Sequence, residues 1–320
     1  MRIVIVGPGI MPIPPKGWGA VESLIWDYKL FLEKIPGIQV FIVNTPHPQE
    51  IVHLTNQCRP DVIHIQYDNL WPLWDQFECK NVLLTSHYGY LDQLEQRPQD
   101  GYVGIFKGFL DCSAKIVALS PSIEKMYLTY GCPQNRVCVV ANGANDEVFK
   151  YRPEAILPDR SIYLAKIDYR KRQYVYQNID FIDFVGNLAD GRFQPMRPNY
   201  KGEWDKSHLY EHLTDYANLV LLSDGEAHPL VCCEALVCGL GLVISEFAAA
   251  NLDRSLPWID VIPTERLDDL DYVAQVIREN QIKSAVYREK IREYGLKHFT
   301  WKVVVQKYLG MIENFFGLKV

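Results

Sequence analysis

Short apolar runs alternate with stretches of helical periodicity along most of this 320-residue chain, and this alternation limits the folds open to it. Runs of four or five residues rich in Val and Ile have the length and composition of buried strands. Strands and helices in repeated alternation build a parallel sheet with helices on both faces. The predicted strands of the first half are Ile3–Val6, Val40–Val43, Val62–Gln66, Val82–Ser86, Lys115–Leu119 and Val137–Ala141.

A second set of predicted strands follows Tyr151–Pro158, a proline-containing segment that we interpret as a linker. The chain therefore divides into two α/β domains with doubly wound parallel sheets, residues 1–150 and 151–300, and a C-terminal helix in residues 301–320 that begins after Thr300 as N-cap. The second set comprises Ser161–Ala165, Ile182–Gly186, Leu219–Ser223, Leu242–Ser245 and Ile259–Ile262. The clearest helical periodicity lies in Ala20–Glu33, Ser122–Tyr130, Asp271–Asn280 and Lys283–His298.

Composition argues against several classes of function. The net charge of −6 and the pI near 5.8 disfavour non-specific nucleic-acid binding, which needs a basic surface. No apolar run reaches the ~18 residues of a membrane-spanning helix, and the first residues lack a secretory cleavage pattern, so we expect a cytoplasmic protein. The eight cysteines form no C-x-x-C pair, which favours reduced, buried thiols over a zinc cluster or a disulfide framework.

Two carboxylates mark the strongest candidate site. Glu226 follows the turn-forming pair Asp224-Gly225, and Glu234 lies inside the helix that is predicted to follow. The unpaired N–H groups and the positive dipole end at the start of such a helix favour a phosphate. The pattern predicts a phosphosugar site in which Glu226 holds sugar hydroxyls and Glu234 holds ribose hydroxyls.

This E-x7-E element resembles that of the retaining glycosyltransferases of the GT-B fold, family 4 in particular. The residues that carry the likeness are Glu234-Ala235-Leu236-Val237-Cys238-Gly239 and the strand that ends at Ser245. The resemblance implies two Rossmann-like domains facing a cleft, with the donor on the second domain and the acceptor on the first. It also implies that His228 and Leu230 contact the donor. Pro229, between them, has no N–H group and departs from the glycine-rich loop usual in the family.

A basic run from Lys166 to Arg172 resembles the family phrase G-R-L-x-x-x-K-G, in which an arginine and a lysine bind the donor diphosphate. The resemblance implies that Lys166 and Lys171 take these two roles and stabilise the leaving diphosphate without a metal ion. Taken alone, a basic turn of this kind is usually a solvated surface.

Two motifs of the first half complete the candidate site. Gly17-Trp18-Gly19 resembles the P-x-x-G-G-x-E opening of family 4, in which glycines allow the backbone to approach the donor. Pro12 breaks the G-x-G-x-x-G pattern that begins at Gly7, which disfavours dinucleotide binding. The resemblance implies that His87, after the strand Val82–Ser86, contacts the donor sugar or positions the acceptor; a satisfied loop histidine is the alternative. His64 is interpreted as structural.

The resemblance implies retaining transfer of a hexose from a nucleotide-diphosphate sugar, UDP-linked first and GDP-linked second, to a hydroxyl of a carbohydrate or glycoconjugate. The implied catalytic residues are Glu226, His87, Lys166 and Lys171, with no metal or other cofactor. Two alternatives stay open: an epimerase or phosphorylase of the same architecture, and a non-catalytic nucleotide-sugar-binding protein. Lys297, Lys302 and Lys307 would allow contact with an anionic membrane, although a solvated helix face is preferred.

Overall fold

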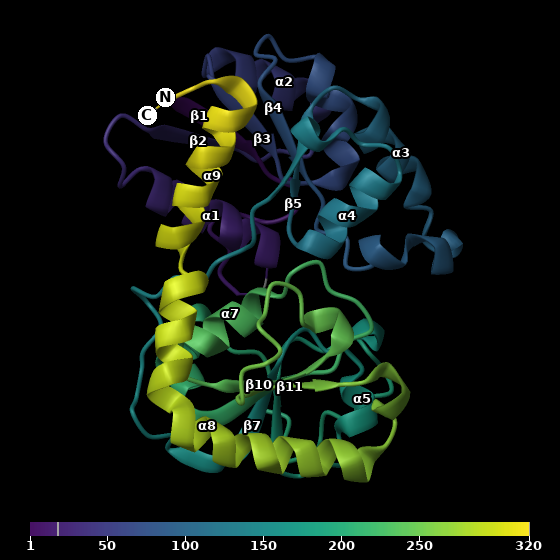
Figure 1. Cartoon of the computed structure of the whole chain (residues 1–320), viewed down its shortest axis with the longest axis vertical. Coiled ribbons are helices and arrows are strands. Elements are labelled where there is room, and N and C mark those ends of the chain that lie inside the picture. The colour runs from purple at the N-terminus through teal and green to yellow at the C-terminus, as the bar shows by residue number, and fades with distance from the viewer. Residues whose placement is uncertain (18, 320) are drawn as a thin grey trace. The chain divides into compact units, whose positions relative to one another are not determined.

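Two parallel β-sheets organise the chain, and the structure, a computed structural model, describes residues 1–17 and 19–319 (Figure 1). Trp18, part of the glycine-rich motif, lies outside the described residues. The N-terminal unit comprises Met1–Pro15, Gly19–Asn142 and the last helix from Trp301 onward, and the C-terminal unit comprises Gly143–Thr300 with the short segment that starts at Lys16. The boundary between the two units in this part of the chain therefore falls at Asn142 and Gly143, whereas the sequence suggested residue 150.

The N-terminal unit contains a six-stranded sheet in the order β2-β1-β3-β4-β5-β6, with all neighbours parallel. Strand β2 lies on one side of β1, and β3 to β6 follow in sequence order on its other side. The direction of strand order therefore reverses between β1 and β3. Ligands of doubly wound sheets bind outside the carboxyl ends of the strands at such a reversal. The strands are β1 (Arg2–Val6), β2 (Gln39–Val43), β3 (Val62–Ile65), β4 (Val82–Thr85), β5 (Lys115–Ala118) and β6 (Val137–Val139).

Four α-helices and several 3₁₀ segments connect these strands. The helices are α1 (Ala20–Leu32), α2 (Pro48–Gln57), α3 (Val103–Asp111) and α4 (Pro121–Thr129), and the 3₁₀ segments are η1 (Asp68–Asp75), η2 (Leu91–Gln96), η3 (Pro98–Asp100) and η4 (Gln134–Arg136). The side chain of Ser120 caps α4 by accepting a hydrogen bond from the N–H of Ile123. Strands β3 and β4 are buried at every position, so the centre of this sheet forms the core.

The last helix, α9 (Trp301–Phe316), packs against α1 of the N-terminal unit. The ring of Tyr28 on α1 lies 4.7 Å from that of Trp301 and 5.1 Å from that of Tyr308, and all three side chains are buried. The hydroxyl of Thr300 donates to the carbonyl of Leu296, four residues earlier. The aromatic contacts of Tyr28 therefore hold α9 against α1.

The C-terminal unit contains a five-stranded parallel sheet in the order β11-β10-β9-β7-β8. Its strands are β7 (Leu157–Leu164), β8 (Ile182–Val185), β9 (Tyr216–Leu221), β10 (Gly241–Ser245) and β11 (Ile259–Ile262). Its helices are α5 (Gln173–Tyr176), α6 (Lys206–His212), α7 (Leu230–Val237) and α8 (Leu270–His298), with 3₁₀ segments η5 (Tyr169–Lys171), η6 (Leu213–Asp215), η7 (Glu246–Ala248) and η8 (Thr264–Arg266).

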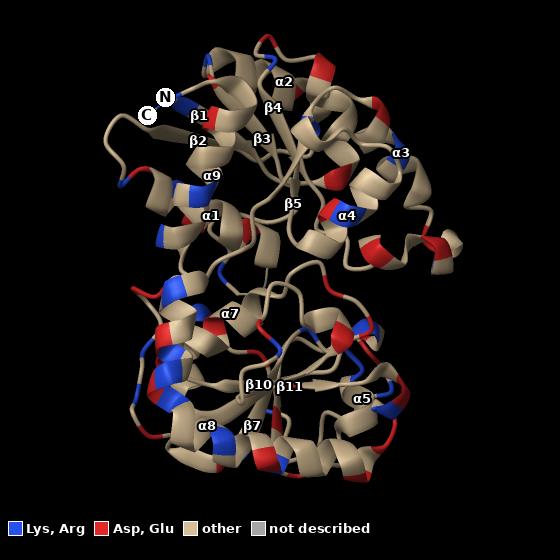
Figure 2. Ribbon diagram, viewed as in Figure 1, with Lys and Arg blue, Asp and Glu red and all other residues tan. Residues whose placement is uncertain are grey.

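Helix α8 corrects one prediction, because it runs unbroken where the sequence indicated two helices that part near residue 281. The polar residues that interrupted the apolar pattern are buried and bonded to the sheet. The amide of Asn280 donates to the carbonyl of Leu242 at 3.2 Å, and that of Gln281 donates to the hydroxyl of Ser161 at 2.9 Å. Figure 2 shows acidic and basic residues interspersed along α8. No helix within residues 1–17 and 19–319 is long and apolar enough to cross a membrane.

Candidate functional site

The turn that follows β7 is held in one shape by buried polar contacts. The side chain of Gln173 is fully buried and donates to the carbonyl of Lys166 at 2.8 Å. The carboxylate of Asp168 accepts a hydrogen bond from the N–H of Lys171 at 3.0 Å. Gly186, at the end of β8, packs directly on this turn, since a Cβ there would lie 1.9 Å from the carbonyl oxygen of Ala165. The backbone that carries the basic residues is therefore preorganised.

Glu226 is the centre of an ion cluster in the C-terminal unit. Its carboxylate bonds to the ammonium of Lys171 through Oε1 and lies 3.4 Å from Nη1 of Arg170 through Oε2. The side chain of Glu226 is 7% exposed, that of Lys171 11% and that of Arg170 27%. Arg170 also donates to the carbonyl of Gly225 at 2.7 Å. The E-x7-E loop and the basic turn are thus bonded to each other, with two cations around one carboxylate.

The pKa values of this cluster follow from burial and charge. Burial favours the neutral form of Glu226, but the charges of Lys171 and Arg170 outweigh it and hold the pKa of Glu226 below its usual range. Burial lowers the pKa of Lys171, and Glu226 partly opposes this shift. The carboxylate therefore stays ionised at neutral pH because its cations surround it.

A second set of ion pairs fixes the same two loops. Arg172 adopts a φ of 58° and bonds to Asp224 at 3.2 Å and to Asp268 at 2.6 Å. The N–H of Asp224 donates to the carbonyl of Arg170 at 2.8 Å. The guanidinium of Arg172 thus bonds to two carboxylates of the protein. The side chain of Lys166 is exposed.

The second glutamate, Glu234, lies on α7 as predicted and is half-buried. Burial raises its pKa, and the charge of Lys206 opposes that shift. Pro229 is the N-cap of α7, so the first two helical N–H groups belong to Leu230 and Val231, which have no partner within a helix. Pro229 lacks an N–H group, but it precedes the helix, so the N–H groups of Leu230 and Val231 remain available as donors.

The other loop residues predicted to bind the donor lie beside α7. His228 is buried, its Nε2 is 3.9 Å from Sγ of Cys233, and burial lowers its pKa to about 4. Leu230 is half-buried at the first position of the helix. Cys232 and Cys233 are buried, as predicted for the thiols of this chain. All eight cysteines are free thiols.

In the N-terminal unit, His87 ends a chain of hydrogen bonds that fixes its tautomer. Its Nε2–H donates to Oε1 of Gln66 at 2.8 Å, and Nε2 of Gln66 donates to Nδ1 of His64 at 3.2 Å. His64 is fully buried and also bonds to Thr85 and Tyr308, as expected for a structural residue. Burial lowers the pKa of His87 to about 4, so its ring is neutral at pH 7 and Nδ1 carries no proton.

The glycines of the first loop are explained by packing within the protein. A Cβ at Gly7 would lie 2.7 Å from Oδ1 of Asn44, and one at Gly9, where φ is +70°, would lie 2.5 Å from the carbonyl of Thr45. Gly19 is the N-cap of α1 and adopts a φ of +126° that L-residues rarely take. Gly17 is half-buried, and a Cβ there would lie 3.0 Å from Oε1 of Glu203.

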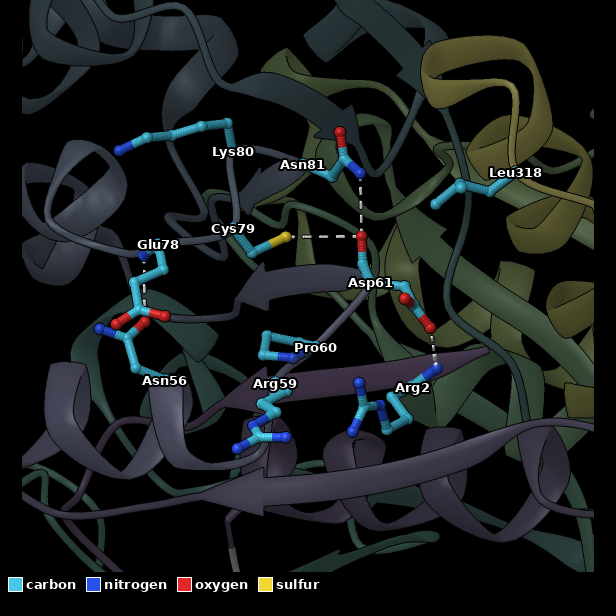
Figure 3. A pocket seen from close by; sticks show the side chains of 10 residues that line it. All are labelled: Arg2, Asn56, Arg59, Pro60, Asp61, Glu78, Cys79, Lys80, Asn81 and Leu318. Atoms are coloured by element: carbon cyan, nitrogen blue, oxygen red, sulfur yellow. Dashed lines mark hydrogen bonds between the residues drawn. The ribbon is translucent and has the colours of Figure 1, made fainter.

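A cavity of about 450 Å³ lies near the starts of β1, β3 and β4, at the edge of the N-terminal sheet away from the carboxyl ends of its strands. Figure 3 shows the side chains that line it. Arg2, Arg59 and Lys80 line it with Asp61 and Glu78, and the carbonyl of Asp61 accepts a hydrogen bond from Asn81 at 2.9 Å. It contains none of the predicted site residues. In the described part of the chain, no three His, Cys, Asp or Glu side chains are grouped as metal ligands.

A comparison with family models gives a match in the first half of the chain. The family model of Glycosyltransferase Family 4 matches residues 4–148. The matched residues lie almost entirely in the N-terminal unit. None of the curated proteins matches the chain. The resemblance drawn from the sequence is therefore confirmed on independent grounds over this domain.

Solved structures extend the likeness over both units. The chain is similar to sucrose-phosphate synthase from Thermosynechococcus elongatus, with a TM-score of 0.76 and 14% identity over 99% of both chains. It is also similar to HepE from Anabaena in complex with UDP-glucose, with a TM-score of 0.72 and 14% identity over 99% of this chain and 100% of that one. For AviGT4, a glycosyltransferase involved in avilamycin A biosynthesis, the TM-score is 0.70 at 12% identity over 99% and 98% of the chains. The fold is GT-B, as predicted.

Sequence reasoning missed Arg170, the second cation on Glu226. The family phrase directed attention to Lys166 and Lys171, although Arg170 stands in the same basic run. Asp68, three residues after β3, was also missed. Its position just after a buried strand could have marked it as a candidate site residue. The roles assigned to Glu226, Glu234, His87 and the lysines stay predictions.

Proposed function

We propose that this chain is a retaining glycosyltransferase that moves a hexose from a nucleotide-diphosphate sugar to an acceptor hydroxyl without a metal ion. The ion cluster of Glu226, Lys171 and Arg170 carries the proposal, because it places a surplus cation beside the E-x7-E loop. The family 4 domain and the GT-B fold support the same class of reaction.

The charge of the cluster suits a diphosphate. Two cations and one carboxylate leave one positive charge, and Lys171 and Glu226 are largely shielded from water. Fixed charges in such a site interact more strongly than in bulk water and need no reorganisation as negative charge develops on a leaving group. In this proposal Lys171 and Arg170 stabilise the leaving diphosphate, and the exposed Lys166 approaches it from solvent.

The remaining residues take positioning roles in the proposal. Glu226 holds Lys171 in place and orients the sugar hydroxyls, and Glu234, half-exposed on α7, holds the ribose. The N–H groups at the start of α7 face a phosphate or a sugar oxygen, with His228 and Leu230 beside them. His87 is neutral and offers an unprotonated nitrogen to a hydroxyl. Gly17 and Gly19 allow the backbone to come close to the donor.

A UDP-linked hexose is the first choice of donor and a GDP-linked hexose the second. The similar HepE structures are complexes with UDP-glucose and with UDP and glucose, and these ligands support the choice of uridine. A carbohydrate or glycoconjugate hydroxyl is the proposed acceptor.

A thermal-shift screen tests the donor site. The wild type and Glu234→Gln are melted with UDP, GDP, ADP, dTDP or CMP in the presence of EDTA. A nucleotide at a hundred times its dissociation constant adds about 2.7 kcal/mol to the free energy of unfolding and raises the melting temperature by several degrees. The expected result is a shift with UDP that Glu234→Gln removes; no shift with any nucleotide would refute the donor site.

Turnover separates the enzyme from the second candidate, a non-catalytic nucleotide-sugar-binding protein. That candidate is favoured by the exposed lysine at position 166, where the family has an arginine with a bidentate fork. NMR of the product from UDP-glucose and a sugar acceptor reports both transfer and anomeric configuration. Retention supports the proposal, inversion refutes the retaining mechanism, and nucleotide binding without product supports the second candidate.

A further inference from the structure

Asp68 lies at the edge of the N-terminal sheet where doubly wound folds bind ligands. It is the first residue of η1 and follows β3 by three positions. Strand β4 pairs with β3 in parallel, so Ser86 and His87, which follow β4, leave the sheet at the same edge. This edge adjoins the reversal of strand order between β1 and β3.

The carboxylate of Asp68 is enclosed by polar groups but is not fully satisfied by them. Its Oδ1 atom is buried and accepts no hydrogen bond within residues 1–17 and 19–319. Burial raises the pKa of Asp68 to about 6, and Tyr102, Ser86 and the backbone N–H of His87 oppose this shift. A buried carboxylate oxygen without a donor costs free energy, and such a group in a native protein calls for an explanation.

Hydrogen bonds and ring contacts surround Asp68, and no Lys or Arg among residues 1–17 and 19–319 shifts its pKa. The hydroxyls of Ser86 and Tyr102 are 2.5 Å apart, and the N–H of Tyr88 donates to the hydroxyl of Ser86 at 3.1 Å. The rings of Tyr88 and Tyr102 stack with centroids 4.0 Å apart. Tyr102 and Tyr127 are the titratable groups that interact with Asp68, and His87, whose ring is neutral, acts on it through its backbone N–H.

We propose that Asp68 Oδ1 binds a hydroxyl of a neutral carbohydrate acceptor and thereby selects uncharged over phosphorylated acceptors. The inference rests on the proposed glycosyltransferase function and names a specificity residue for it. Oδ1 of Asp68 and Nδ1 of His87, in the loops that follow the paired strands β3 and β4, can accept hydrogen bonds and donate none. Sugar hydroxyls supply the matching donors. A phosphate at this position would face a carboxylate without a cation to offset the repulsion.

The test compares Asp68→Asn with the control Asp75→Asn, an exposed carboxylate on the same 3₁₀ segment. The probes are glucose, maltose and glucose 6-phosphate, each with saturating UDP, and binding is followed by saturation-transfer-difference NMR titration. The wild type and Asp75→Asn are expected to bind a neutral sugar more tightly than glucose 6-phosphate. Asp68→Asn should weaken neutral-sugar binding by roughly tenfold or more, since a neutral amide replaces the charged acceptor of the hydrogen bond.

Melting temperature distinguishes a ligand-binding carboxylate from a structural one. Burial outweighs the hydrogen bonds to Asp68 and raises its pKa, so at pH 8 Asp68→Asn should melt above the wild type while the shift caused by UDP is unchanged. A lower melting temperature together with a lost UDP shift would assign Asp68 a structural role and overturn the inference. Neutral-sugar binding equal to that of the wild type would overturn it as well.

The outcomes also separate this inference from the proposed function. If the wild type responds to UDP but binds no neutral sugar, the Asp68 assignment fails alone. If the wild type responds to no nucleotide either, the glycosyltransferase function fails with it. Asp68→Ala provides a second variant, which should show the same loss of sugar binding if the carboxylate itself makes the contact.

Discussion

Replacing Lys171 by methionine removes the ammonium from the ion cluster with little change in side-chain volume. Glu226, 7% exposed, then keeps Arg170, at 3.4 Å, as its cation. Removal of one partner from a buried ion pair costs about 3–5 kcal/mol, and the remaining cation places this change at the lower end, about 3 kcal/mol. At roughly 2–4 °C per kcal/mol for a unit of this size, the C-terminal unit should melt about 6–12 °C lower.

The double variant Lys171→Met, Glu226→Gln is the matched control. It removes both charges of the pair, so no carboxylate is left buried without its ammonium, and Arg170 keeps its 2.7 Å bond to the carbonyl of Gly225. Replacing a buried pair with neutral groups is often close to neutral, so the double variant should lie within about 1 kcal/mol of the wild type. Both variants should lose the thermal shift caused by UDP.

Urea denaturation followed by tryptophan fluorescence gives the free energies, because urea leaves the ionic strength unchanged. A coupling energy of about 2 kcal/mol between the two substitutions is expected. The reasoning is refuted if Lys171→Met costs less than about 1 kcal/mol or if the two costs simply add. Nucleotide binding that survives in the stable double variant would remove Lys171 from the donor site while leaving its structural role.

The remaining predictions concern single sites. Gly9→Ala should cost at least about 2 kcal/mol in urea titration, because a Cβ there meets a backbone carbonyl at 2.5 Å and φ is +70°, whereas Gly104→Ala in open space on α3 should gain up to about 1 kcal/mol. His64→Ala should cost about 3 kcal/mol in the same assay, since several buried partners lose their hydrogen bonds. Glu234→Gln should preserve or raise the melting temperature at pH 7, because burial raises the pKa of this carboxyl, and a clear drop would contradict its assignment to the ligand. The pKa of Asp68 rises on folding from 3.8 to about 6, so its protonated form favours the folded state. The gain in melting temperature of Asp68→Asn over the wild type should therefore be absent below pH 3.8, grow between pH 3.8 and pH 6 and be complete above pH 6. Melting curves from pH 4 to pH 8 measure this gain.

Local patterns were enough to predict most of the elements. Strand β11 covers the predicted residues end to end, and α1 begins at Ala20 as its periodicity indicated. The prediction failed at α8, where buried polar side chains interrupt the apolar pattern that a helix against a sheet normally shows. Asn280 and Gln281 find their partners on strands far away in sequence, so their burial depends on tertiary contacts that no local window contains.

The candidate site was predicted only as far as it is local in sequence. Glu226 and Glu234 are close along the chain, and a turn before a helix is enough to suggest a ligand. The bond from Arg170 to Glu226 joins residues 56 positions apart and depends on strand order. Strands β7 and β9 are neighbours although β8 comes between them in sequence, so the loops after β7 and β9 leave the sheet side by side. A sequence without a known strand order does not reveal that juxtaposition.

The two candidate sites differ in the sign of their electrostatics, and this difference suits glycosyl transfer. Around Glu226 the cations exceed the carboxylate, which favours a ligand with a diphosphate. Asp68 and the neutral His87 present hydrogen-bond acceptors, and no Lys or Arg in the described part of the chain shifts the pKa of Asp68, which favours hydroxyl groups over phosphate. Under the two proposals, a nucleotide sugar and a neutral acceptor are sorted by charge before either is recognised by shape. On this reasoning a nucleotide competes poorly for the Asp68 site, and each substrate reaches its own unit.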